Sequence, residues 1–400
     1  MQDHNDDHQN SDEQTGEVLE RLEEIRDQLD DEPELESTAP REAFQMWLQA
    51  NAGKADETVQ SYRYRVETLL RYLDREGIDD LADLTTRDVK EFEVERRADP
   101  DVGKQTRSNQ FGTIRQFLQF CENMNAVSGD VVNALDIPAL TKEDKVNTEK
   151  LVAERAESIL DDLNQFQYAS RKHVLFALLW RTTARIGTIR SLDVDDVYLD
   201  GDDLERVRDE LEAEFPTSVV EEILGDVELP FLWPQHRPET GTALKNGEGG
   251  ERVINIADWL GDVLASYLRV NRPDVEDDHG REPLLATRKG NGRLSKSAMR
   301  NWIYILTQPC EFGGPCPHDR DPEECEAREH GQGSKCPSAR SPHKLRTGAI
   351  TNHRDRGWPI SELSDKANTS EELIAGVYDQ PEQLVRASHR RSLLEKMEDH

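Results

Sequence analysis

The stretch HVLFALLWRTTARIGTIRSL, residues 173–192, joins an apolar segment to Arg185. Its LFALLW portion is apolar on every side of a helix, which predicts a helix buried in a domain core. We expect this helix to run into Arg185, a charge that is costly beside a core unless it pairs or binds something. The nearby acids at 193, 195 and 196 are possible ion-pair partners. The alternative is a binding role for Arg185.

Helical patterns surround this stretch, and a short β region interrupts them. Residues 157–163, 259–268 and 295–306 repeat apolar side chains at helical spacing. ELPFLWP (228–234) and RVINI (252–256) predict two strands that flank a polar, glycine-rich loop. The predicted fold class is therefore mainly α with a small antiparallel β-sheet.

Three other pieces of the chain carry residues that suit phosphodiester chemistry together with Arg185. Lys245 lies in TALKNGEGGERVINI, His343 and Arg346 in SPHKLR, and Tyr378 in AGVYDQ. Guanidinium groups grip phosphoryl oxygens with paired donors, and a phenol can serve as the nucleophile. A histidine can manage the phenol proton, and a lysine can protonate a departing sugar oxygen. These residues predict catalysis with no cofactor.

Each of these assignments has a structural alternative, which for Tyr378 is a tyrosine packed at a helix end. His343 and Arg346 are three positions apart and share one helix face if SPHKLRTGAITNHRDRG is helical, with Ser-Pro at 341–342 as its start. His353 and Arg354 in the same segment are the alternative candidates. Lys245 lies in a polar loop, where a lysine is usually a solvated charge.

The order Arg, Lys, His-x-x-Arg, Tyr resembles that of the tyrosine recombinase (phage integrase) family, from about residue 40 to the end. The resemblance implies a site-specific DNA recombinase that cleaves and rejoins strands through a 3′-phosphotyrosyl intermediate. It implies Tyr378, the only tyrosine after Arg346, as the nucleophile. It also implies double-stranded DNA as partner, with two protomers per site and four per synapse.

Two positions depart from the family pattern. Thr188 stands where relatives commonly carry an acid, three residues after Arg185. Asn368 occupies the slot, ten residues before the tyrosine, where relatives usually have a histidine or tryptophan that binds the scissile phosphate. An amide donates a hydrogen bond but exchanges no proton near neutral pH. We therefore assign Asn368 to the catalytic set in a positioning role.

Two other functions share parts of this pattern. A type IB topoisomerase uses the same chemistry to relax supercoils as a monomer. A zinc-containing DNA-binding regulator without activity would fit the changes at Thr188 and Asn368. A compact helical domain ahead of the catalytic residues favours the recombinase.

The N-terminal third of the chain divides by composition. Residues 1–36 are acidic and too polar to fold alone, apart from a short helix whose seam would be Val18, Leu22, Ile25 and Leu29. Residues 37–125 carry two apolar helical stripes and match the core-binding (SAM-like) DNA-binding domain in size and position. Residues 126–150 have weak periodicity and predict a linker. Residues 151–400 form the catalytic domain, with a cysteine-rich insert at 309–340.

Four of the five cysteines fall in that insert, at positions Cys310, Cys316, Cys325 and Cys336. The segment is rich in glycine and proline and has little core of its own, so tetrahedral ligation by thiolates could fold it. The sequence therefore predicts a structural zinc site. Four ordinary reduced cysteines are the alternative.

Composition points to an intracellular protein of high-salt surroundings. The net charge is −32, from 82 acids against 50 bases spread along the chain. An acidic exterior no longer repels DNA at a distance when molar salt shortens the Debye length to about 3 Å. No run of 18 apolar residues and no signal peptide are present, so we expect a halophilic, cytoplasmic protein without a membrane span.

Overall fold

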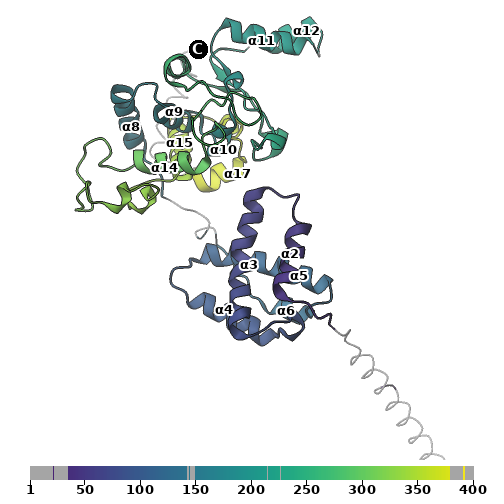
Figure 1. The fold of residues 1–400 in the computed structure, drawn as a ribbon. Helices are drawn as coiled ribbons and strands as arrows, with labels where there is room; N and C mark the ends of the chain where they lie inside the picture. The colour runs from purple at the N-terminus through teal and green to yellow at the C-terminus, as the bar shows by residue number, and fades with distance from the viewer. Residues whose placement is uncertain are drawn as a thin grey trace, which may run out of the picture. The chain divides into compact units, whose positions relative to one another are not determined.

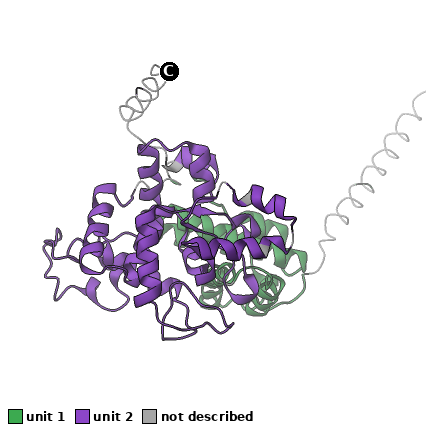
Figure 2. Cartoon of the chain, turned by 90° about the horizontal axis from the view of Figure 1, so that it is seen from above, with its two compact units in different colours: residues 1–146 green, residues 147–400 purple. Residues whose placement is uncertain are grey.

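The computed structural model describes residues 35–141, 149–213, 215–225 and 227–378, with single residues at 21, 144 and 391. At residues 56, 210, 223, 377 and 378 it describes only the backbone. The chain forms two compact units, Met1–Val146 and Asn147–His400 (Figures 1 and 2). The predicted acidic segment 1–36, with its seam at 18–29, lies almost wholly outside the described residues.

Unit 1 is a helical bundle. Its long helices α3 and α5 pack on each other and on α2, and their apolar stripes meet in a core that includes Phe44, Trp47 and Phe117. Gly77 ends α3 in the left-handed conformation that favours glycine. The elements are α2 (Pro40–Ala50), α3 (Asp56–Glu76), η1 (Leu81–Asp83), α4 (Thr86–Ala98), α5 (Lys104–Asn123) and α6 (Gly129–Ala134).

The predicted linker 126–150 needs a correction at its start. Ala126, Val127, Val131, Val132 and Leu135 are buried in the core of unit 1. Four of these apolar residues lie in or beside the short helix α6, which packs on α4 and α5. A six-residue helix shows too little periodicity to be recognised in sequence. Unit 1 therefore extends beyond residue 125.

Helix α9 (Arg171–Thr182) is the central helix of unit 2. Nine of its twelve residues are buried, as the apolar LFALLW segment predicts. It contacts five helices around it. These are α8 (Ala153–Phe166), α10 (Ile186–Ser191), α13 (Asp258–Ser266), α14 (Lys296–Leu306) and α15 (Pro342–Asp355).

The expectation of one continuous helix into Arg185 was wrong. Helix α9 ends at Thr182, and Thr183 adopts a left-handed conformation with φ 56°. Arg185 then stands at the N-cap of α10. A β-branched residue rarely adopts positive φ, so the sequence carries no local signal for this break.

The small sheet has three antiparallel strands in the order β1, β2, β3. Strands β2 (Phe231–Leu232) and β3 (Ile254–Asn255) fall within the two predicted strand segments. Strand β1 (Val197–Tyr198) is an addition that the sequence analysis missed. Helices α11 (Gly201–Glu212) and α12 (Thr217–Leu224) form a projection between β1 and β2 (Figure 1).

The C-terminal part of unit 2 is built from short helices and turns. Helix α15 is followed by α16 (Ile360–Ala367), α17 (Glu371–Leu373) and the π-helical turn η8 (Ile374–Tyr378). A π-turn η5 (Tyr267–Asn271) extends α13. The remaining 3₁₀ turns are η2 (Val194–Asp196), η3 (Pro238–Thr240), η4 (Gly247–Gly250), η6 (Glu326–Arg328) and η7 (Gly333–Lys335). The fold is thus mainly helical with a small antiparallel sheet, as predicted.

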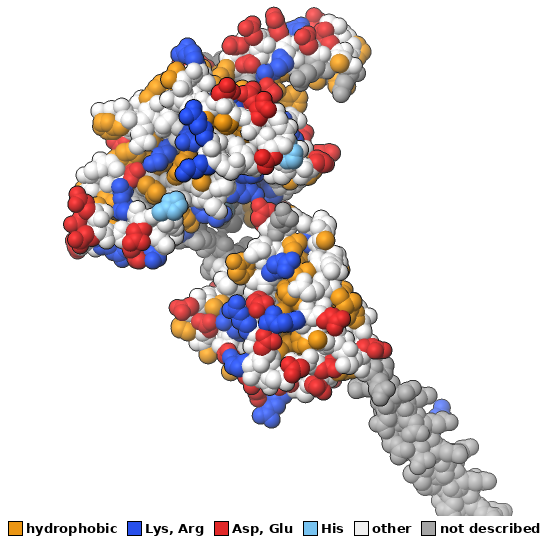
Figure 3. All heavy atoms as spheres, viewed as in Figure 1, with side chains coloured by type: hydrophobic (Ala, Val, Ile, Leu, Met, Phe, Trp, Pro, Cys, Tyr) orange, Lys and Arg blue, Asp and Glu red, His pale blue; other side chains and the backbone are white. Residues whose placement is uncertain are grey.

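Acidic and basic side chains are interspersed over the face drawn in Figure 3, and acids are dense on α11 and α12 at its upper edge. None of the described helices is both long and apolar enough to span a bilayer.

We predict that KCl stabilises the fold. With a net charge of −32, like charges repel across the surface, and screening weakens this repulsion as the Debye length falls from about 10 Å at 0.1 M to about 3 Å at 1 M. The melting temperature is therefore expected to rise steadily over this range of KCl. Thermal melts followed by circular dichroism test this, and a flat or falling melting temperature would contradict it.

Candidate active site

Three arginines of unit 2 converge on the carboxyl end of helix α16. The backbone carbonyls of residues 366–368, here called the α16 turn, accept hydrogen bonds from one arginine each. Arg252 donates Nε and Nη2 to the first carbonyl at 3.1 and 2.9 Å. Arg346 donates Nη2 to the second at 2.7 Å, and Arg185 donates Nη1 to the third at 2.7 Å. A helix C-terminus carries unsatisfied carbonyls and partial negative charge, so it suits cations.

Asn368 shapes this turn. It ends α16 in the left-handed conformation, with φ 48°, which asparagine tolerates better than most residues. Its Oδ1 accepts from Asn246 Nδ2 at 2.8 Å, and its own Nδ2 donates to the Gly249 carbonyl at 3.3 Å. The side chain therefore ties the α16 turn to the loop between β2 and β3, which also carries Lys245.

Helix α15 carries Arg346 and fixes its position. Ser341 caps its start by accepting from the Lys344 amide, with Pro342 in the first turn, as the sequence predicts. Gly348 permits close packing, because a Cβ there would lie 2.0 Å from the Leu151 carbonyl oxygen. Arg346 is only 4% exposed and also donates Nη1 to the Thr183 carbonyl, at the break after α9. The left-handed Thr183 thus presents its carbonyl to a site arginine.

His343 lies at the exposed start of α15, among positive charges. Neighbouring protein atoms remove part of its hydration, and this lowers the pKa of the ring below its usual range. The charges of Arg346, Arg185 and Lys245 lower the pKa further. Lys245 is itself exposed. His343 is therefore neutral at pH 7 and can accept a proton.

Arg252 is a site residue that the sequence analysis did not select. Besides the α16 turn it contacts the Gly250 carbonyl through Nη1 at 3.0 Å, so it links both sides of the site. Burial lowers its pKa to about 10, and the charge of Arg185 contributes. It remains charged at neutral pH. The sequence feature that could have identified Arg252 is its position in ERVINI, directly after the glycine-rich loop.

The acids that the sequence offered as partners of Arg185 form ion pairs with other arginines. Asp196 binds Arg237 at 2.6 Å, and Asp193 pairs with the buried Arg293. Asp277 pairs with Arg293 at 2.8 Å; burial opposes ionisation of Asp277, but the hydrogen bond from Arg293 keeps its pKa low. This buried ionic cluster fixes the end of α10, since Arg293 also donates to the Arg190 carbonyl at 3.0 Å.

His353 has a packing role. Its Nδ1 lies 2.8 Å from the Ala349 carbonyl oxygen, and its ring meets Trp358 edge-on with centroids 5.1 Å apart. Burial lowers its pKa to about 4. It therefore stays neutral and structural.

The backbone of Tyr378 ends the turn η8, while its side chain lies outside the described residues. The structure thus brings together Arg185, Lys245, His343, Arg346 and Asn368, and adds Arg252. The assignment of Tyr378 as nucleophile stays a prediction.

The cysteines of the insert lie near one another. Burial raises the pKa of Cys310, and negative charge on Cys316 or Cys336 raises it further. Cys325 packs on a small cluster that contains Cys336. Over the described part of the chain, no three His, Cys, Asp or Glu side chains are grouped so that they could hold a metal ion. Zinc ligation by Cys310, Cys316, Cys325 and Cys336 would therefore require the thiolates to draw closer together.

The zinc prediction is tested by metal analysis. Protein prepared without chelator is expected to hold about one zinc per chain if the thiolates ligate it. Cys325→Ser should then lose zinc and lower the melting temperature, whereas Ser334→Ala, an exposed change in the same insert, should do neither. A protein without zinc would refute the prediction.

Comparisons with known proteins agree with this architecture. Residues 42–124 match the family model of the phage integrase N-terminal SAM-like domain. The tyrosine recombinase XerD of Mycobacterium tuberculosis is 29% identical over 161 residues, which cover 38% of this chain and 51% of the relative. XerC of Oceanobacillus iheyensis is 24% identical over 158 residues, 39% of this chain and 50% of the relative. The chain spans about half the length of the curated relatives it matches.

Two solved structures share the fold over most of the chain. The Tn1549 transposon integrase in complex with transposon right end DNA has a TM-score of 0.55 at 12% identity, covering 89% of this chain and all of that one. A lambda integrase dimer bound to a COC′ core site has a TM-score of 0.53 at 12% identity. The match covers 87% of this chain and 97% of that one.

Proposed function

We propose that the chain is a tyrosine-type site-specific DNA recombinase with Tyr378 as nucleophile, in line with its similarity to tyrosine recombinases and integrases. The observation that carries the proposal is the convergence of Arg185, Arg252 and Arg346 on the α16 turn, with His343 and Lys245 beside them. A cluster of positively charged side chains is suited to a phosphodiester.

Arg185 and Arg346 are the proposed phosphate ligands. An arginine has five N–H donors, and the carbonyls of the α16 turn hold some of them in place. The planar guanidinium keeps its charge while negative charge grows on a pentacoordinate phosphorus. Arg252, which links the α16 turn to the loop of Lys245, is a positioning residue.

The cleavage step balances as a phosphoryl transfer. The Tyr378 oxygen forms a bond to phosphorus as the bond from phosphorus to the 5′ oxygen breaks, leaving a 3′-phosphotyrosyl ester. Neutral His343 takes the phenol proton, and Lys245 supplies a proton to the departing 5′ oxygen. Attack by the 5′-hydroxyl of a partner strand reverses the step. The residues proposed here perform each proton transfer without a cofactor.

Double-stranded DNA is the proposed substrate, bound by more than one protomer. Solved integrase structures of this fold include a dimer on a core site and a tetramer on a Holliday junction. Two protomers per site and four per synapse would place one nucleophile at each strand to be cut.

A suicide duplex carrying the protein's own site tests the proposal. A nick beside the scissile phosphate lets the 5′-hydroxyl fragment diffuse away, so the ester cannot be reversed. The expected result is a protein–DNA adduct that survives denaturing electrophoresis. Relaxation of plasmids of random sequence would favour a topoisomerase, and the lack of any adduct would contradict cleavage.

A further inference from the structure

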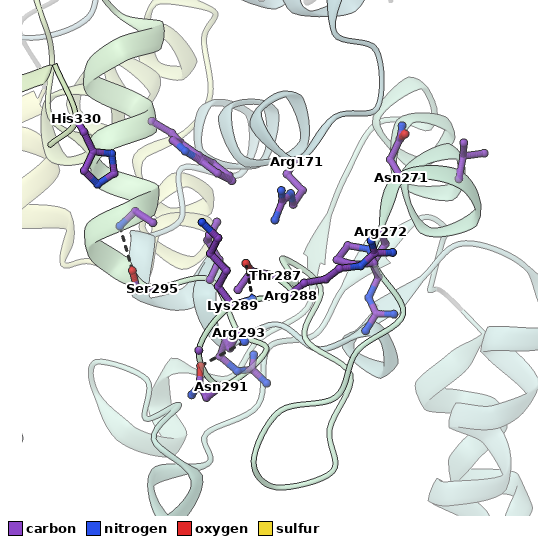
Figure 4. Close-up of a pocket in the computed structure, with 16 residues that line it drawn as sticks. Arg171, Asn271, Arg272, Thr287, Arg288, Lys289, Asn291, Arg293, Ser295 and His330 are labelled. Atoms are coloured by element: carbon purple, nitrogen blue, oxygen red, sulfur yellow. Dashed lines mark hydrogen bonds between the residues drawn. The ribbon is translucent and has the colours of Figure 1, made fainter. Parts of the chain in front are cut away.

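A cationic pocket lies in unit 2, outside the proposed active site. It is a pocket of about 820 Å³ between the start of α9, the loop 287–291 and helix α14 (Figure 4). Sixteen residues line it, and none is an aspartate or glutamate. Acids make up about one fifth of the chain, 82 of 400 residues. A lining without them is therefore a local reversal of the surface charge.

Two of its five lining cations are already neutralised. Arg293 pairs with Asp193 and Asp277 in the buried ionic cluster. Arg272 pairs with Glu282 at 3.1 Å. These two shape the wall of the pocket.

The other three cations supply its net charge. Arg171 is held by the Ala286 carbonyl at 2.9 Å and lies over the Trp302 ring at 5.5 Å. In Figure 4 it points from α9 toward the loop that carries Arg288 and Lys289. Arg288 and Lys289 are exposed, and no ion pair with a described residue is found for any of the three. Arg171 is thus held in place by its contacts, and Arg288 and Lys289 are exposed to solvent.

We propose that this pocket binds phosphate groups, separately from the site at Arg185. Arginine offers a fork of donors to phosphate oxygens, lysine offers a point charge, and the lining has no carboxylate to repel them. The volume is within the range of about 300–1,000 Å³ for ligand sites. The phosphates can belong to DNA away from the cleaved bond, which rests on the proposed function, or to a free phosphate compound.

The variant Arg288→Ala/Lys289→Ala tests the DNA source. Duplex affinity is measured over a series of KCl concentrations, with Arg320→Ala/Lys335→Ala as the control that removes equal charge from exposed positions of the insert. Each phosphate contact adds about 0.9 to the slope of log affinity against log salt. The pocket variant is expected to reduce this slope by about 2, and the control is expected to leave it unchanged.

Inorganic pyrophosphate tests the second source. If the duplex slope is unchanged, pyrophosphate should raise the melting temperature of the wild type and the control but not of the pocket variant. This result assigns the pocket to a free phosphate compound. The proposal is overturned when the pocket variant matches the control in both measurements. The proposed function is tested separately, by whether the wild type forms an adduct with a suicide duplex. The outcome of that test does not depend on either measurement of the pocket.

Discussion

The variant Tyr378→Phe is expected to form no denaturant-resistant adduct with a suicide duplex while it still binds that duplex. Phenylalanine keeps the ring and removes only the attacking oxygen, so no ester to DNA can form. Under the proposed function, binding depends on groups other than this hydroxyl, including the arginines at the α16 turn. Denaturing electrophoresis measures the adduct, and a gel-shift titration measures the affinity.

The control for this experiment is Tyr168→Phe, which removes the hydroxyl of a 47% exposed tyrosine in the same unit. It should form the adduct as the wild type does. Peptide sequencing of the wild-type adduct should place DNA on Tyr378. An adduct that persists in Tyr378→Phe, or that maps to another tyrosine, would end this assignment.

Arg346→Ala and Arg185→Ala should each slow cleavage by about a hundredfold or more. Removal of one fixed donor from a site that stabilises developing negative charge costs about that much. The loss should appear in the rate of adduct formation at saturating protein, measured by quenched time courses. For Arg346, which is 4% exposed, the alanine variant also leaves the carbonyls of Thr183 and Ala367 without a donor, so the melting temperature should fall.

Two further variants separate charge from geometry. Arg346→Lys keeps the charge but cannot reach two carbonyls with a planar fork, so its rate should lie between those of the wild type and the alanine variant. Arg356→Ala, an exposed change at the other end of the same helix, should cleave at the wild-type rate. Equal rates for Arg346→Ala and the wild type would exclude a role for this arginine at the phosphate.

Elements with strong local signals were predictable from the sequence. The apolar LFALLW segment became the buried α9, and the Ser-Pro start of α15 lies where it was expected. The strands on either side of the glycine-rich loop also form. These features depend on periodicity, capping and turn chemistry. Each of these is determined by residues close together in the sequence.

Features that depend on distant contacts were not predictable. Arg185 stands at an N-cap because Thr183 breaks the helix, and the Thr183 carbonyl then accepts from Arg346, 163 residues along the chain. In the sequence, Arg252 is an arginine at the start of a predicted strand. Its role becomes visible only in the structure, where it donates to a carbonyl at the end of α16. The recognition of Arg185, His343 and Arg346 from the family order required no such contact.

The carbonyls of the α16 turn have a consequence for the timing of the reaction. They occupy the arginines with the protein's own dipoles before any substrate arrives. Under the proposed function, an incoming phosphate would meet guanidinium groups that already have their orientation, so little reorganisation energy would be spent in assembling them. The cationic half of the site is complete in the resting protein. Under the proposed function, what remains to be placed for cleavage is the oxygen of Tyr378, which belongs to the segment that follows this turn.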